Sequence, residues 1–188
     1  MILDHRADLY EACQRLCPID PAYANLPIEQ GFNWFSCLGD ARFEGLYLVV
    51  FRSVRRAAAD LALLEEHDDQ AYAAALEAGG LLRYFKGEVN VRRECLSFCL
   101  WERREQALSA SGGATHRRAA QLSAEMYESY VLERYDLLKT GGSLVFRPLG
   151  GTSRHSVYPT SRSLAMSLPA PHLAQETTRQ TGDDENIA

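Results

Sequence analysis

The sequence of 188 residues has no long apolar run and no excess of basic side chains. Its longest apolar stretches are about six residues, whereas a helix that crosses a bilayer needs about 20. We therefore expect no transmembrane segment and no membrane partner. The net charge of −5 and the isoelectric point near 5.6 also argue against nucleic acid as a partner, because binding to a phosphate backbone requires a basic surface.

The chain also lacks a cysteine pattern typical of disulfides or metal sites. It has five cysteines, an odd number, and none of them form a Cys-x-x-Cys pair: they are Cys13, Cys17, Cys37, Cys95 and Cys99. No charged-then-apolar leader is present in the first 20 residues. We expect free thiols, no metal site and a cytoplasmic location.

What the sequence does contain is an ordered series of strand-like and helix-like segments. The order is strand, helix, strand, strand, helix, strand, over Gly45–Arg52, Ala57–Ala78, Leu81–Lys86, Glu94–Glu102, Arg103–Ser109 continuing in Thr115–Leu138, and Ser143–Pro148. Gly79 and Gly80 are placed to end the first helix. This βαββαβ order predicts an α+β fold of the ferredoxin-like type.

The flanking segments differ in composition from this central part. Residues 1–42 contain a predicted helix, Leu3–Leu16, and an aromatic cluster, Phe32-Asn33-Trp34-Phe35, which we expect to cover the domain or close one end of a pocket. Residues 43–149 form the predicted ferredoxin-like domain. Residues 150–188, rich in Ser, Thr, Pro and Gln, are predicted to be a flexible tail.

The third predicted strand carries the clearest chemical pattern. Because side chains alternate along a strand, one face receives Leu96, Phe98 and Leu100, and the other receives Cys95, Ser97, Cys99 and Trp101. The purely apolar set is suited to packing against the helices. The mixed set is therefore expected on the far face, as the lining of a cavity.

Several of these segments resemble a known superfamily. Leu48-Val49-Val50-Phe51-Arg52, Gly80-Leu81-Leu82-Arg83-Tyr84, Cys99-Leu100-Trp101, Glu105-Gln106-Ala107 and the later His116 make the chain similar to the dimeric α+β barrel superfamily, within it to antibiotic-biosynthesis monooxygenase-like domains and their uncharacterised relatives. The resemblance implies a homodimer whose two sheets pack face to face around a small hydrophobic ligand. Members include cofactor-independent oxygenases, cyclases and haem-degrading enzymes.

The resemblance favours an enzyme of natural-product metabolism that acts on a hydrophobic or aromatic substrate. The expected activity is that of a cofactor-independent monooxygenase or a cyclase, with no bound cofactor. Two alternatives stay open at this point: a haem-binding protein with His116 as axial ligand, and a non-catalytic ligand-binding dimer. The fold alone does not determine which of these functions the protein has.

The candidate site residues follow from the same resemblance. His116 is expected to move a proton, and Arg83 or Arg52 to hold an oxyanion, while Trp101 stacks on the substrate. Further candidates for contact with substrate are Ser97, Cys99, Tyr47, Tyr84, Tyr127, Tyr130 and Trp34, with Tyr127 and Tyr130 expected on the second helix. For each, a purely structural role is the alternative: a solvated histidine, salt-bridged arginines and packed aromatic rings.

Overall fold

The computed structural model describes residues 5–112, 125–150 and 153–155, and its centre is a six-stranded antiparallel sheet. The strands are β1 (Gly45–Arg55), β2 (Leu81–Phe85), β3 (Glu94–Trp101), β4 (Tyr127–Thr140), β5 (Ser143–Pro148) and β6 (Ser153–His155). Their order is β2-β3-β1-β4-β5, with β6 paired to β4. The order of the first four strands confirms the ferredoxin-like α+β prediction.

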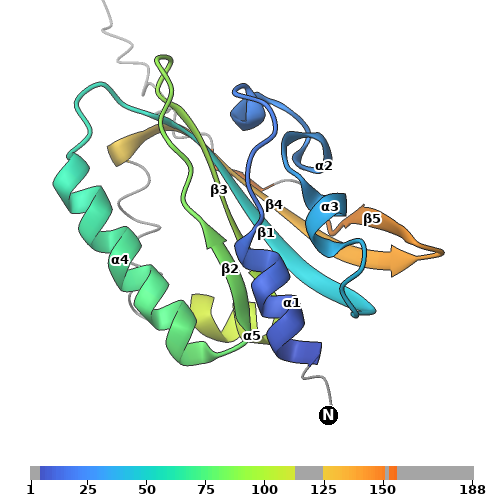
Figure 1. The fold of residues 1–188 in the computed structure, drawn as a ribbon. Coiled ribbons are helices and arrows are strands. Elements are labelled where there is room, and N and C mark those ends of the chain that lie inside the picture. Colours follow the sequence, from blue (N-terminus) through green and yellow to red (C-terminus); the bar gives the residue numbers. More distant parts are fainter. Residues whose placement is uncertain (1–4, 113–124, 151–152, 156–188) are drawn as a thin grey trace, which may run out of the picture. The chain divides into compact units, whose positions relative to one another are not determined.

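Helices lie on both sides of this sheet (Figure 1). One side has α4 (Leu61–Ala78) and α5 (Arg104–Ser111), which follow β1 and β3. The other side has the N-terminal segment of residues 5–38, made of α1 (His5–Gln14), η1 (Tyr23–Asn25), α2 (Ile28–Gly31) and α3 (Trp34–Leu38). The sheet is thus the middle one of three layers.

The ends of α4 are set by local chemistry. The Asp60 side chain accepts a hydrogen bond from the backbone N–H of Leu63 at 3.1 Å, which caps the first turn. At the other end Gly79 takes a φ of 72°, a conformation that glycine adopts without steric cost. The predicted helix and its glycine stop are confirmed, with the helix beginning at Leu61 rather than at Ala57.

The prediction of a second helix was wrong over residues 127–138, because these residues form part of strand β4. Its Glu, Leu, Arg and Lys residues favour helix locally, but β4 pairs along almost its full length with the central strand β1. Tyr130 lies opposite Ser53, and Leu137 lies opposite Leu46. Tertiary pairing therefore outweighs the local preference, and the register shift at Val54/Arg55 puts Tyr127 and Tyr130 on one face of the strand, whereas Tyr135 is on the other.

Gly141 and Gly142 form a hairpin turn and do not end a helix. Their φ values are 57° and 81°, and they connect β4 to β5 with Thr140 opposite Ser143. Two residues with positive φ match the turn that suits the twist of a two-residue hairpin. The segment Ser143–Pro148 is a strand as predicted, but it is an additional edge strand beside β4.

The apolar face of the sheet packs against the N-terminal segment. Leu96, Phe98 and Leu100 share one buried cluster with residues of the N-terminal segment, including Leu16, Ile28, Phe32, Trp34 and Leu38. The prediction that the apolar set faces the helix that follows β1 was therefore wrong. The N-terminal segment offers many large apolar side chains to bury it, whereas Ala75 is the one buried residue of α4.

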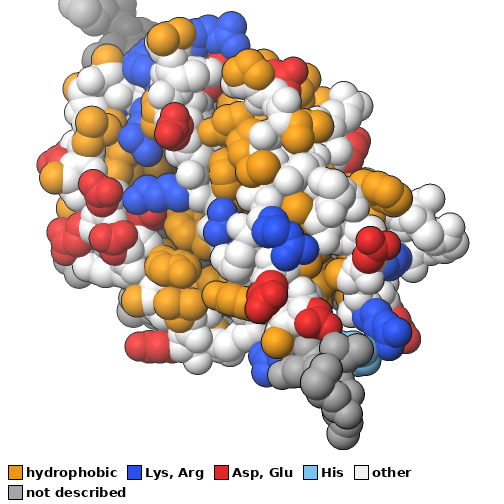
Figure 2. Space-filling view, in the orientation of Figure 1, with side chains coloured by type: hydrophobic (Ala, Val, Ile, Leu, Met, Phe, Trp, Pro, Cys, Tyr) orange, Lys and Arg blue, Asp and Glu red, His pale blue; other side chains and the backbone are white. Residues whose placement is uncertain are grey.

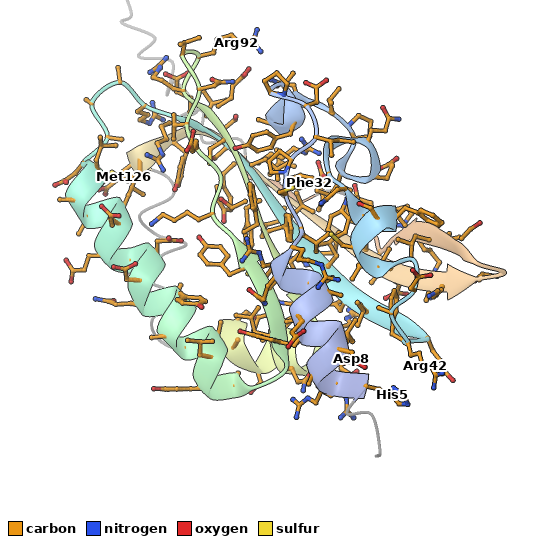
Figure 3. The ribbon with its side chains drawn as sticks, in the orientation of Figure 1. His5, Asp8, Phe32, Arg42, Arg92 and Met126 are labelled. Atoms are coloured by element: carbon orange, nitrogen blue, oxygen red, sulfur yellow. The ribbon has the colours of Figure 1, made fainter. Side chains whose placement is uncertain are left out.

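Phe32 lies at the centre of this interface (Figure 3). Its ring centroid is 5.2 Å from that of Phe98, 5.0 Å from that of Phe85 and 5.8 Å from that of Trp34. The contacts with Phe98 and Phe85 are edge-to-face, the favoured geometry for aromatic pairs. The aromatic segment therefore covers the domain, one of the two roles expected for it.

The covered face bears directly on the expected dimer. A face-to-face dimer of two sheets needs one bare apolar face on each subunit. In the described residues that face is occupied by the chain's own residues 5–38, and the opposite face lies under α4 and α5. A barrel dimer of the expected kind would require the N-terminal segment to leave the sheet.

Arg52 fastens the N-terminal segment to the sheet. Its Nε lies 2.8 Å from Oε1 of Glu133 on β4, and its two terminal nitrogens donate to the carbonyl oxygens of Ala24 and Leu26 at 2.7 and 2.8 Å. Both side chains of the ion pair are about one-fifth exposed. This shielding makes the pair stronger than a surface salt bridge.

We predict that Arg52→Met lowers the free energy of unfolding by about 2–4 kcal/mol, because Glu133 and two carbonyls lose their partner. The matched control is Arg147→Met, which breaks an exposed ion pair with Asp136 and is expected to cost at most about 1 kcal/mol. Urea unfolding followed by circular dichroism measures both. Equal small losses for the two variants would contradict the anchoring role.

Candidate functional site

The face of the sheet that carries Trp101 lies under α4 and α5. Trp101 and Tyr47 are paired across β3 and β1, are 4% and 3% exposed, and pack with Ala75 of α4 and Ala107 of α5. The prediction that the mixed face of the third strand points away from these helices was wrong. Helices of the same chain therefore cover this face: Trp101 and Tyr47 are buried, whereas Cys99 and Tyr130 are half-buried.

A carboxylate and a phenol meet on this face, between α4 and β2. The hydroxyl of Tyr84 donates a short hydrogen bond to Oδ1 of Asp68, and the ammonium of Lys86 lies 2.9 Å from Oδ2 of Asp68. Burial, followed by the neighbouring Asp68 carboxylate, raises the pKa of Tyr84. The phenol is thus neutral at physiological pH, and it holds the carboxylate in one orientation.

Asp68 was not among the predicted site residues, although its position in the sequence carries a signal. It falls in register with Leu64, Ala71 and Ala75 on one stripe of α4, at spacings of three or four residues. The opposite face of α4 carries exposed acidic side chains, which Figure 2 shows in red at the left edge. A carboxylate on the inner stripe of a helix needs a partner there, and Tyr84 with Lys86 supplies it.

Two further phenols lie on the same face, on β4. The rings of Tyr127 and Tyr130 are 5.3 Å apart, and Tyr130 lies 6.4 Å from the ring of Phe51 on β1. Burial is the main cause that raises the pKa of both tyrosines. Both therefore stay protonated and can donate hydrogen bonds.

The thiols of this face are not nucleophiles at neutral pH. Burial raises the pKa of Cys99 to about 12, with the Asp68 carboxylate as a second cause. Burial also raises the pKa of Cys95, whose Sγ lies 3.3 Å from the carbonyl oxygen of Gly87. Ser97 accepts a hydrogen bond from the N–H of Gly87 at 3.1 Å, so it helps to close the β2–β3 connection.

The structure divides the predicted site residues between two faces. Tyr47, Tyr84, Ser97, Cys99, Trp101, Tyr127 and Tyr130 lie on the face toward α4 and α5. Arg52 and Trp34 lie on the face covered by the N-terminal segment, and Arg83 donates to Gln14 of α1 at 3.1 Å. One pocket cannot contain both groups, so neither arginine is placed to hold an oxyanion beside Trp101. His116 lies outside the described residues.

Other features of the described residues offer less chemistry. No three His, Cys, Asp or Glu side chains among them converge in a way that would hold a metal ion. Within the same ranges, no helix is long and apolar enough to span a bilayer. An open depression of about 500 Å³ is lined by residues 40–44 and Lys139, but Lys139 donates to the carbonyl oxygens of Gly39 and Ala41, so its ammonium is already committed.

The raised pKa values predict a loss of stability in alkali. A phenol whose pKa in the folded protein exceeds its ordinary value of 10 stabilises the fold fully below pH 10, and this contribution is lost as the pH rises through the folded-state pKa. We expect the free energy of unfolding to fall between pH 10 and 11, and to fall less steeply in Tyr130→Phe. Urea unfolding at each pH measures the free energy of unfolding, and absorbance at 295 nm measures how much phenolate forms in the folded protein. If Tyr84, Tyr127 and Tyr130 lose their protons near pH 10 in the folded protein, the prediction is contradicted.

Comparison with solved structures finds proteins that are similar to about half of the chain. Protein SO0527 from Shewanella oneidensis is 14% identical with a TM-score of 0.45, over 52% of this chain and 96% of that chain. SnoaB, a cofactor-independent oxygenase from Streptomyces nogalater, is 12% identical with a TM-score of 0.41, and the match covers 54% of this chain and 100% of SnoaB. A putative antibiotic biosynthesis monooxygenase from Nitrosomonas europaea is 12% identical with a TM-score of 0.41, and the match covers 53% of this chain and 94% of that protein.

Among curated proteins, none matches the chain. A family model described as PB2B2.08-like matches residues 2–147, which include the N-terminal segment as well as strands β1 to β4. This match spans more than half of the sequence, and it takes in both the covered face of the sheet and the face that carries Asp68 and the tyrosines. The chain belongs to the PB2B2.08-like family.

Proposed function

We propose that the protein is a cofactor-independent monooxygenase that acts on a hydrophobic aromatic molecule bound between α4 and the sheet. The observation that carries the proposal is the joint placement of one carboxylate, Asp68, and the phenols of Tyr127 and Tyr130 on a single aromatic face of the sheet. The reaction class is the one that the sequence resemblance implies. The roles of the residues come from what these side chains can do.

The walls of this face suit a flat aromatic substrate. Phe51, Tyr127 and Tyr130 present a run of rings along β1 and β4, and Tyr72 of α4 lies against Tyr84 with ring centroids 5.4 Å apart. Aromatic rings recognise other rings through offset or edge contacts and exclude water from between them. An apolar, aromatic-lined site with a few fixed polar groups is typical of small-molecule enzymes.

Asp68 is the proton acceptor in this proposal. It removes a proton from an activated CH₂ group of the substrate, for example the C10 position of an anthrone, and leaves an extended enolate. The electrons for oxygen reduction then come from the substrate. Addition of O₂ at that carbon gives a hydroperoxide, which loses water to form a carbonyl, so that one anthrone and one O₂ yield one anthraquinone and one H₂O.

The phenols of Tyr127 and Tyr130 stabilise the negative charge that develops on the substrate oxygen. Because burial keeps both phenols protonated, each can donate a hydrogen bond to an oxyanion. In an environment with little water such a donor acts more strongly than it would in bulk solvent. The same proton abstraction also begins a cyclisation, and oxygen uptake distinguishes the two reactions.

We predict that Asp68→Asn lowers kcat for oxygen-dependent conversion of dithranol, a hydroxylated anthrone, by about 100-fold or more. The introduced amide keeps a carbonyl oxygen that can accept the Tyr84 hydrogen bond, so the fold is expected to be retained. An oxygen electrode and the quinone absorbance give the rate above the uncatalysed background. The matched control is Glu66→Gln, on the exposed side of α4, where the carboxylate accepts a hydrogen bond from Gln70 at 3.0 Å; its rate is expected to be unchanged.

Three outcomes would overturn the proposal. One is full activity in Asp68→Asn, and another is the absence of any enzyme-dependent oxygen uptake. A third is a Soret band in the purified protein together with loss of activity on removal of haem, which would favour the haem-binding alternative.

A further inference from the structure

Arg55 is the last residue of β1, and it lies at one end of the face that carries Asp68 and the tyrosines. In the register of the sheet it is opposite Tyr127 of β4. Its positive charge lowers the pKa of both Tyr127 and Cys95, so its guanidinium lies near both. The side chain therefore belongs to the same face as the proposed site.

The guanidinium of Arg55 has no partner among the described residues. Its Nε is buried without a hydrogen bond, and no ion pair to Arg55 is found there. Neighbouring cations differ in this respect: Lys86 pairs with Asp68 at 2.9 Å, and Arg93 pairs with Glu128 at 2.8 Å. A guanidinium nitrogen removed from water without an acceptor is unfavourable, so Arg55 is set up to gain from a ligand that supplies one.

The unused hydrogen-bonding capacity at this end of the face consists of donors. Arg55 offers guanidinium N–H groups, and Tyr127 and Tyr130 offer protonated hydroxyls. The nearby acceptor, Asp68, is already engaged by Tyr84 and Lys86, which balances its charge. The complementary ligand group is therefore one that only accepts and carries negative charge.

We propose that the substrate of this site carries an anionic oxygen group, a carboxylate being the preferred case, and that Arg55 is the residue that recognises it. This inference rests on the proposed function, since it names the substrate class of the same site. A planar carboxylate matches the fork of guanidinium donors, and Tyr127, the partner of Arg55 across the sheet, offers a hydroxyl to the same group. The aromatic part of the substrate then extends along β4 toward Tyr130 and Phe51.

The test uses binding of two product-like probes that differ in one group, anthraquinone-2-carboxylate and anthraquinone-2-carboxamide. We expect the full-length protein to bind the carboxylate at least tenfold more tightly than the carboxamide in fluorescence titrations. In Arg55→Gln the carboxylate is expected to lose this advantage, with carboxamide affinity changed by less than twofold. Arg55→Lys is expected to keep part of the preference, because it keeps the charge but loses the fork.

The control is Arg92→Gln, which removes the same charge from the tip of the β2–β3 connection (Figure 3). Arg92 is exposed and pairs with Glu94 at 3.0 Å, so its loss is expected to leave both affinities unchanged. Thermal unfolding of each variant checks that the fold is kept. If Arg55→Gln fails to fold, Arg55→Lys and the preference of the unaltered protein still decide the question.

The outcomes separate this inference from the proposed function. Equal affinity for the two probes, or a carboxylate preference that survives in Arg55→Gln, overturns the role of Arg55 while leaving an aromatic site in place. Arg134 lies in the middle of β4, opposite Val49, and its charge lowers the pKa of Tyr130. A preference lost in Arg134→Gln instead would move the recognition there and overturn the role of Arg55 as well. Failure of both probes to bind removes the proposed function together with this inference.

Discussion

The structure depends on the burial of one mainly apolar sheet face by the chain's own N-terminal segment. Phe32 and Trp34 pack on Phe98, and Arg52 fixes the same segment through Glu133 and two carbonyl oxygens. Burial of apolar surface supplies the driving force, and the arginine sets the register of the segment on the sheet. With that face occupied, the proposed site lies on the other one.

The second face has a different composition because a different layer covers it. The inner stripe of α4 consists of Leu64, two alanines and one carboxylate, so it buries little apolar surface: Ala75 is the one buried residue of α4. Polar side chains of the sheet are therefore tolerated beneath it, provided that they remain neutral or paired. The raised pKa values of Tyr84, Tyr127, Tyr130 and Cys99 express this condition, since burial disfavours their charged forms.

The sequence predicted the central strands well and the two faces poorly. β1, β2 and β3 are apolar runs bounded by glycines and polar turns, which are strong local signals. β4 was missed because residues 127–140 mix helix-favouring side chains with tyrosines, and its pairing with β1 is a long-range effect. The Gly141-Gly142 pair indicates a strand before it, since a two-residue glycine turn between apolar segments is typical of a hairpin.

The prediction of which helices cover which face of the sheet was reversed for a related reason. Alternation along β3 correctly separated Phe98 from Trp101, but it does not say which face receives which layer. That depends on residues 5–38, which lie more than 50 residues earlier in the chain than β3 and whose contribution to the core exceeds that of α4. Asp68 was missed in the same way, because its importance comes from Tyr84 and Lys86, which reach it only once α4 has folded over β2.

The arrangement also changes what a second subunit would contribute. The candidate carboxylate and phenols come from α4, β2 and β4 of one chain, and the helix that covers them is part of that chain too. In a barrel dimer built sheet to sheet, the partner would lie on the opposite face, against the surface that Phe32 and Trp34 now occupy. The chemistry proposed for this site therefore requires no residue from a partner, and association of two copies would act on it only through the sheet that the two faces share.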